Sequence, residues 1–415
     1  MLICEVLSSK LFIAQDVCRL PHGDRFRLFR PAGVAYHPFC DDFGPMNLSS
    51  VALFCEQLNI ELKEHPDSRI IYSVDQDPRS LTNAVFLVGA YLILLENKAA
   101  ADVLETFDWL DDSLVEHFRD ATYSHADFRL TLEDCWRGLE RGVTLGWLRA
   151  PEDEVREMWG EINIPEYLHY DSPANGDFHV VVPGRFIAFK GPADLGGLAY
   201  ADGDDGARTF SPSAYADIFA DDFGVAAVVQ LNEEQYDPAA FTARGIRHHA
   251  LPFPDCASPP PAVFAAFLNV ADAALAAGGA VAVHCLAGLG RTGTLIALHL
   301  MRSHGFTARE AMGWLRVMRP GSVIGPQQHF LCAAEARPDA GGGPRLLGYG
   351  PGATTSGREG RRRQGGGSGD GSDGEAAERE DSDEAAPRRR LAAEVAGGAL
   401  RRGAARARAE GAGGA

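Results

Sequence analysis

The segment from Ala280 to His304 constrains the fold of this 415-residue chain more than any other part of the sequence. It starts with an apolar run typical of a buried strand, continues with His284-Cys285, five further residues and Arg291-Thr292-Gly293, and then turns apolar again as a helix would. Two glycines among the five intervening residues let the backbone curl, so that successive N–H groups converge at the start of the helix. Such a point binds anions, and the segment therefore predicts a phosphate-binding loop between a strand and a helix.

The side chains of this loop suit covalent phosphoryl transfer. We expect Cys285 to be the nucleophile, because the helix N-terminus and the converging N–H groups favour its thiolate near neutral pH. Arg291 would bind two phosphoryl oxygens, and Thr292 would donate a hydrogen bond that stabilises the departing sulfur. His284 is expected to order the loop rather than to act as a base. The residues whose backbone would surround the phosphate, before Arg291, are Leu286, Ala287, Gly288, Leu289 and Gly290. The alternative is a buried structural cysteine at a strand end.

An acid and a positioned water complete such a reaction. The best candidate for the acid is Asp255, in a proline-punctuated loop between a predicted strand and the next helix, although the pattern equally allows an N-terminal helix cap there. Farther on, Gln327 and Gln328 stand at a predicted helix start, and either amide could orient the water that hydrolyses a phosphocysteine. Because backbone N–H groups and Arg291 handle the phosphate charge, we expect no metal and no other cofactor.

Strand and helix patterns alternate twice along the chain, which indicates an α/β fold with largely parallel sheets. In the first half, Arg69 to Val74 reads as a buried strand and Thr82 to Asn97 as the helix behind it. In the second, the strand is Ala280 to His284 and the helix is Arg291 to His304. The polar stretch 151–177, with helical fragments, is expected to connect the halves.

Composition bounds the remaining possibilities. From residue 338 onward Gly, Ala, Arg, Ser and Asp replace aromatic and aliphatic residues, so 338–415 is predicted to be a disordered tail. The net charge of -18 disfavours nucleic-acid binding and favours basic partners or substrates, although it also fits mere solubility. The eight cysteines include no Cys-x-x-Cys pair, which argues against a zinc site and a disulfide framework.

Membrane and secretion signals are not expected either. The longest apolar run, Ala84 to Leu95, is shorter than the ~20 residues that cross a bilayer and reads as a core helix. The start of the chain carries a glutamate among its apolar residues and no basic segment before them, unlike a secretory signal. We therefore expect an intracellular protein, in the nucleus, the cytoplasm or both, without membrane insertion.

Together these motifs resemble the Cdc-fourteen family of mitotic-exit dual-specificity phosphatases, which remove phosphate from sites written by cyclin-dependent kinases. The resemblance covers roughly residues 3 to 335 and leaves out only the tail. The segments that carry it are Asp42–Leu48, Asn83–Tyr91, Asn175–Asp177, Pro183–Phe189, Val228–Asn232, Ala280–Thr294 and Arg319–Phe330.

The resemblance implies two tandem dual-specificity-phosphatase-like domains, each with a largely parallel sheet flanked by helices. These would be an N-terminal non-catalytic domain at 1–150, a linker at 151–177, a catalytic domain at 178–337 and the tail. In the first domain Ser73 stands before Asp75-Gln76, where a phosphate loop would begin, and no Cys-x5-Arg pattern surrounds it. That domain would therefore serve specificity and scaffolding.

The resemblance also implies a specificity groove in the linker for phosphoserine followed by proline, with a basic residue farther along the substrate. Tyr170 would line the proline pocket, and Asp171 and Asp177 would supply negative charge. Cell-cycle regulation would be the setting. Three residues depart from the family pattern: Leu286 replaces the usual Lys, Leu168 replaces an acid in the groove, and Cys256 replaces the Gly after the general acid.

Three other functions compete with this reading. A phosphoinositide phosphatase would favour lysines in the loop, where this chain has leucines, and an acidic body would be repelled by an anionic membrane. A tyrosine-specific phosphatase would use the same loop, but no separate tyrosine-recognition segment is identifiable. A non-catalytic scaffold that binds phosphoproteins is disfavoured, because Cys285, Arg291, Thr292 and Asp255 are all present.

Overall fold

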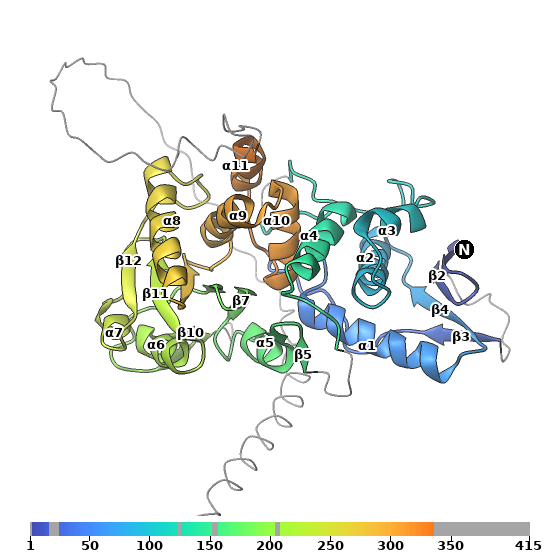
Figure 1. The fold of residues 1–415 in the computed structure, drawn as a ribbon, viewed down its shortest axis with the longest axis horizontal. Coiled ribbons are helices and arrows are strands. Elements are labelled where there is room, and N and C mark those ends of the chain that lie inside the picture. The colour runs from blue at the N-terminus through green and yellow to red at the C-terminus, as the bar shows by residue number, and fades with distance from the viewer. Residues whose placement is uncertain (1, 16–24, 123–125, 152–156, 204–207, 336–415) are drawn as a thin grey trace, which may run out of the picture. The chain divides into compact units, whose positions relative to one another are not determined.

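The computed structural model describes residues 2–15, 25–122, 126–151, 157–203 and 208–335. The predicted tail, 338–415, lies outside these residues. Within the described part the chain forms two α/β halves, each built on its own sheet (Figure 1). Both sheets are largely parallel, so the predicted fold class is confirmed.

The first half has a four-stranded sheet in the order β1-β2-β4-β3. Strand β2 pairs parallel to β4, which also pairs parallel to β3, and only the edge pair β1 and β2 is antiparallel. The strands are β1 (Leu2–Leu7), β2 (Leu11–Gln15), β3 (Phe26–Phe29) and β4 (Arg69–Val74). The helices are α1 (Leu48–Glu64), α2 (Pro78–Leu94), α3 (Ala100–Thr106) and α4 (Leu132–Thr144).

Helix α2 is the central helix of this half and is buried from Leu81 to Leu94. The core helix predicted from the apolar run is thus confirmed, but it spans Pro78–Leu94 rather than Thr82 to Asn97. The Asp77 side chain accepts a hydrogen bond from the N–H of Ser80, and Pro78 occupies the first turn, so the capping residues lie upstream of the apolar stretch. None of the helices in the described residues is long and apolar enough to cross a membrane.

The second half has a five-stranded sheet in the order β12-β11-β13-β8-β7. All its pairs are parallel except β7 with β8. Its strands are β7 (Phe178–Val182), β8 (Phe186–Phe189), β11 (Val225–Gln230), β12 (Arg247–Ala250) and β13 (Ala280–His284), and a separate hairpin is formed by β9 (Tyr200–Asp202) and β10 (Arg208–Phe210). Its helices are α6 (Pro212–Asp221), α7 (Ala239–Thr242), α8 (Pro261–Ala276), α9 (Gly290–His304), α10 (Ala308–Met318) and α11 (Pro326–Glu335). The connecting stretch carries a short hairpin, β5 (Met158–Trp159) with β6 (Ile162–Asn163), and helix α5 (Ile164–Asp171).

Helix α4 of the first half packs against helix α10 of the second (Figure 1). They approach closely because glycines face each other: a Cβ on Gly138 would lie 2.6 Å from the carbonyl oxygen of Glu310, and one on Gly313 would lie 2.5 Å from that of Asp134. Side chains of both halves belong to one continuous hydrophobic core. The first half therefore packs against the second as part of one body.

Candidate active site

Cys285 lies at the carboxyl end of β13, the central strand of the second sheet, and is almost fully buried. Ligand sites of open parallel sheets lie at this edge, where loops lead into helix N-termini. The loop after Cys285 runs directly into α9, which begins at Gly290. The predicted strand, loop and helix are therefore confirmed in this order. Leu286, the position where the family pattern has Lys, is 62% exposed.

The backbone of the loop is turned so that its carbonyl groups point outward. Every carbonyl from Cys285 to Leu289 accepts a hydrogen bond. His284 Nδ1 donates to Cys285, Gly191 N to Leu286, and the Arg319 guanidinium to Ala287 and Gly288. The carbonyl of Leu289 accepts from both Gly293 N and Val323 N. Within the described residues, no protein acceptor receives a hydrogen bond from the N–H groups of Leu286 to Leu289. These N–H groups, with those of the first turn of α9, are the donors that the predicted phosphate-binding loop would use.

Gly288 makes this turn possible. Its φ is +71°, in the left-handed region, and a Cβ there would lie 2.0 Å from the carbonyl oxygen of Phe189. A larger residue would push the loop away from β8 (Phe186–Phe189) and misdirect its N–H groups.

Arg291 is buried and held by backbone carbonyls. Its Nη1 donates to the oxygen atoms of Leu231, at 3.1 Å, and of Phe253, at 2.9 Å. Its Nε lies 3.1 Å from Asp255 Oδ1, in an ion pair whose angles fall short of a hydrogen bond. The guanidinium thus has a fixed orientation beside the loop, with Nε available to a phosphoryl oxygen.

Asp255 lies in the loop between β12 and α8, as predicted, and its side chain is largely exposed. The helix-cap alternative is wrong, because α8 begins at Pro261 with Pro260 at the cap position. The N–H of Cys256 donates to Asp255 Oδ1 at 3.0 Å, and Cys256 has a φ of +54°. This conformation suits glycine and explains why Gly is usual after the acid in the family pattern.

The two glutamines at the start of α11 have different surroundings, although both are buried. Gln327 Nε2 donates at 3.1 Å to the carbonyl of Ala257, in the loop that carries Asp255, called the acid loop below. Gln327 Oε1 lies beside the phosphate loop, because a Cβ on Gly290 would be 2.9 Å from it. Gln328 Oε1 instead accepts a hydrogen bond from Arg316 Nη2 at 2.6 Å. Only Gln327 touches both loops.

His284 lies behind the loop and is fully buried. Its Nδ1 is 3.0 Å from the Cys285 carbonyl, so this nitrogen carries the proton, and Nε2 accepts from the hydroxyl of Tyr236 at 2.7 Å. Burial, the largest influence, lowers the pKa of His284 to about 3. A neutral ring fixed on both sides fits the expected ordering role. Thr292 is also buried, and within the described residues its hydroxyl has no hydrogen-bond partner.

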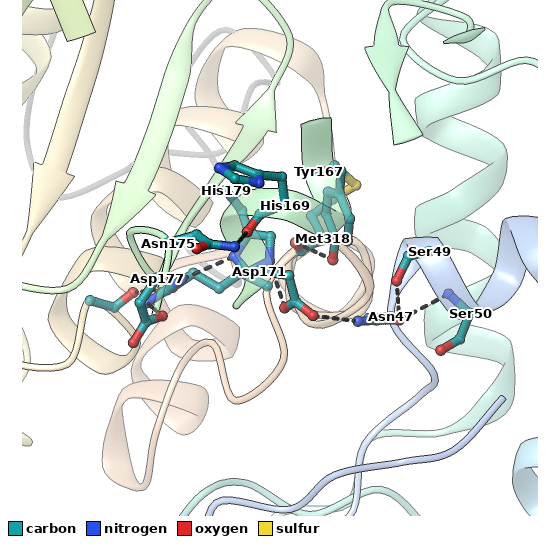
Figure 2. A network of polar contacts seen from close by, with 12 residues as sticks. Asn47, Ser49, Ser50, Tyr167, His169, Asp171, Asn175, Asp177, His179 and Met318 are labelled. Atoms are coloured by element: carbon teal, nitrogen blue, oxygen red, sulfur yellow. Dashed lines mark hydrogen bonds and ion pairs between the residues drawn. The ribbon is translucent and has the colours of Figure 1, made fainter. Parts of the chain in front are cut away.

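Asp171, Asp177 and His179 lie in one network of polar contacts (Figure 2). Arg319 connects them through hydrogen bonds to His179 and Asp177. Arg319 Nη1 donates to His179 Nδ1 at 3.0 Å, and the Nε2–H on the other side of the ring donates to Asp171 Oδ1 at 2.9 Å. Arg319 Nη2 also pairs with Asp177 Oδ1 at 2.9 Å while it binds the carbonyl of Ala287. The two carboxylates therefore support the phosphate loop from behind.

Tyr170 packs against aromatic residues and lines a hollow with acidic side chains. Its ring stacks on Phe178 with centroids 4.1 Å apart, and it lines a hollow together with Glu161, Glu166 and Phe223. Burial, together with the charges of Asp222 and Glu166, raises the pKa of Tyr170 to about 12. Leu168, at the family's acidic position, is exposed.

Three buried residues of the site had no role assigned from the sequence: Tyr236, Arg316 and Arg319. Arg319 is the first residue of an Arg-Pro-Gly motif that directly follows helix α10, and this motif was its only signal. Tyr236 lies far from the loop in sequence and has no pattern that points to it.

Known proteins match the chain in both halves. A family model described as the N-terminal half of dual specificity protein phosphatase matches residues 26–142, and one described as a polymorphic toxin system DSP-PTPase phosphatase matches residues 210–305. The dual specificity protein phosphatase CDC14C of Symphalangus syndactylus is 38% identical over 300 residues, 72% of this chain and 58% of that protein. CDC14A of Homo sapiens is 37% identical over 331 residues, 79% of this chain and 53% of that protein.

A relative named as a tyrosine-protein phosphatase, cdc-14 of Caenorhabditis elegans, is 36% identical over 303 residues, 71% of this chain and 40% of that protein. The chain thus spans less than two thirds of the length of each of these three relatives. Both of its halves are dual-specificity-phosphatase-like domains, and over most of its length the chain is similar to proteins named CDC14 dual specificity phosphatases.

Proposed function

We propose that this chain is a dual-specificity protein phosphatase that works through a phosphocysteine at Cys285. The observation that carries the proposal is the loop after Cys285. Every carbonyl from Cys285 to Leu289 accepts a hydrogen bond, whereas no acceptor in the described residues receives one from the N–H groups of Leu286 to Leu289. These four N–H groups and a fixed guanidinium can bind a phosphoryl group without a metal. The names of the relatives support protein substrates.

The reaction has two steps. In the first, Cys285 Sγ attacks phosphorus, the bond from phosphorus to the substrate oxygen breaks, and Asp255 gives that oxygen a proton. In the second, water attacks the phosphocysteine, gives a proton back to Asp255, and Cys285 leaves as a thiolate, to which the free Thr292 hydroxyl can donate. We assign the orientation of this water to Gln327 rather than Gln328, because only Gln327 contacts both loops.

Substrate choice is the finer part of the proposal. We propose serine phosphates followed by proline, with Lys or Arg farther along, and acceptance of phosphotyrosine and phosphothreonine in vitro. The Tyr170 ring, stacked on Phe178, offers a flat apolar surface for proline, and Glu161 and Glu166 add negative charge beside it. Asp171 and Asp177 contribute less free charge than the sequence suggested, since they pair with His179 and Arg319. Cell-cycle regulation and the nucleus or cytoplasm as its site remain predictions.

A matched peptide series tests this specificity. Phosphoserine-proline peptides with a downstream Lys are expected to have a higher kcat/KM than the same peptides with alanine after the phosphoserine or Glu downstream. Tyr170→Ala should remove the proline preference and leave hydrolysis of an aryl phosphate nearly unchanged, and Glu166→Gln should weaken only the charge preference, by about 0.2–1 kcal/mol for an exposed pair. Equal rates on the proline and alanine peptides would reject the specificity, whereas no turnover of any phosphate ester would reject the phosphatase itself.

A further inference from the structure

Asp120 belongs to the first half but binds the second. It lies between α3 and α4, is 2% exposed, and its Oδ2 accepts a hydrogen bond from the N–H of Gly325 at 2.6 Å. Gly325 directly precedes α11, whose first turn carries Gln327. A carboxylate from the half without a nucleophile therefore fixes the turn that presents the proposed water-orienting glutamine.

The same turn is held from below by Arg316 of α10. This fully buried guanidinium donates to the carbonyls of Ser322 and Val323, at 3.1 and 3.2 Å, and to Gln328 Oε1. Within the described residues it has no carboxylate within ion-pair distance. Burial lowers the pKa of Arg316, and the largest opposing influence is the negative charge of Asp120. Asp120 thus compensates the buried cation as well as holding Gly325.

The side chain of Gln327 depends on this turn for its orientation. Its Oε1 accepts from the N–H of Ile324, the residue before Gly325, at 3.2 Å, while its Nε2 donates to Ala257. A shift of Gly325 moves Ile324 and the first turn of α11 together. The amide would then lose its alignment with the phosphate loop, and a misplacement of about 1 Å can cost roughly 10²-fold in rate.

We propose that Asp120 is a positioning residue for the hydrolysis of the phosphocysteine, acting through Gly325 on Gln327. The first half, which has no Cys-x5-Arg pattern of its own, would thereby complete the active site of the second. This inference rests on the proposed function, in particular on the role of Gln327 in the second step.

Rapid-quench kinetics of the full chain with an aryl phosphate of low leaving-group pKa separate the two steps. The burst of released phenol reports phosphocysteine formation, and its amplitude counts competent enzyme, so partial unfolding does not distort the rates. We expect Asp120→Ala to leave the burst rate within about twofold of the unmodified chain and to slow the steady-state rate per active site by about 10- to 100-fold. Asp120→Asn, which keeps an oxygen that can accept from Gly325, should lose less.

Asp127→Ala is the matched control. Asp127 is also a carboxylate of the first half that contacts α11, through His329 Nε2 at 3.3 Å, but it is 72% exposed and does not touch the turn at Gly325. The burst rate and the steady-state rate of Asp127→Ala should equal those of the unmodified chain. In the double variant Asp120→Ala/Gln327→Ala, hydrolysis of the phosphocysteine should be no slower than in Gln327→Ala alone, because both changes remove the same function, the orientation of the water.

Each outcome of these measurements either supports or overturns the proposed role of Asp120. Unchanged steady-state rates in Asp120→Ala, an equal loss of both rates, or multiplicative losses in the double variant would overturn the positioning role. If Asp120→Ala does not fold, Asp120→Asn is judged by the same criteria, and an unchanged hydrolysis rate there likewise overturns the positioning role. A chain that forms no phosphocysteine in any variant would instead refute the proposed function.

Discussion

Arg291 Nε lies 3.1 Å from Asp255 Oδ1, and the two side chains differ greatly in exposure, at 3% for the guanidinium and 63% for the carboxylate. A buried cation of the phosphate loop thus reaches an exposed anion of the acid loop. In the proposed reaction, a phosphoryl group that entered the loop would compete for Nε and free the carboxylate. The pair would thereby connect substrate binding to placement of the proposed acid.

Asp255→Asn is expected to slow turnover by roughly 10² to 10⁴, the usual contribution of a positioned acid. The loss should be larger for phosphoserine peptides than for an aryl phosphate, because an alkoxide is the poorer leaving group. Single-turnover rates on the two substrates measure this difference. Equal losses in the chemical step would show that Asp255 is not the proton donor.

Gln328→Ala should affect stability more than chemistry. It leaves the buried Arg316 guanidinium without its side-chain acceptor, which is expected to cost about 1–3 kcal/mol of unfolding free energy. Denaturant titration measures this loss, and turnover per active site should stay near that of the unmodified chain. The adjacent Gln327→Ala is the natural comparison, with accumulation of phosphocysteine expected. If Gln328→Ala accumulated phosphocysteine and Gln327→Ala only lost stability, the roles assigned to the two glutamines would have to be exchanged.

Cys256→Gly is predicted to stabilise the chain. A non-glycine residue in the left-handed region costs about 1–2 kcal/mol, and Cys256 has a φ of +54°. Part of this gain is offset by the greater freedom of glycine in the unfolded chain. A rise in unfolding free energy of up to about 1 kcal/mol is expected, and a clear loss of stability would contradict the strained conformation.

His299 should make the fold sensitive to acid. Burial, the largest influence, lowers the pKa of this α9 residue to about 4, while the unfolded chain takes up the proton near 6.5. Between these values the unfolded state binds more protons, so stability is lost as the pH falls from about 6.5 toward 4. His299→Phe should reduce the stability difference between pH 7 and pH 4 by about 2–3 kcal/mol. An unchanged difference in denaturant titrations at the two pH values would refute this contribution.

The sequence was most informative where local chemistry decides structure. The Gly288 turn, the strand before Cys285 and the helix after it follow from spacing within a short segment, and all were predicted correctly. Asp255 was placed in the right loop, although the sequence could not exclude a helix cap. That exclusion needed the start of α8 at Pro261, which periodicity in an alanine-rich stretch does not define.

Long-range contacts were beyond sequence patterns. Nothing near Asp120 indicates that it reaches Gly325, 205 residues away, because this contact depends on the packing of α4 against α10. The same holds for Asp177, expected to offer free charge to a substrate but paired with Arg319. The choice between Gln327 and Gln328 also required the neighbour of each amide, and adjacent residues at a helix start have no local signal that separates them.

The most direct test of the central proposal is to locate the phosphate on the enzyme. The chain is mixed with an aryl phosphate in the presence of a chelator, quenched in acid within milliseconds, digested and mapped by mass spectrometry, with Cys285→Ser as the matched variant. We expect one phosphorylated peptide that carries the phosphate on Cys285, undiminished activity with the chelator, and neither phosphopeptide nor turnover in Cys285→Ser. Phosphate on another residue, activity that requires a metal, or turnover that survives in Cys285→Ser would contradict the proposal.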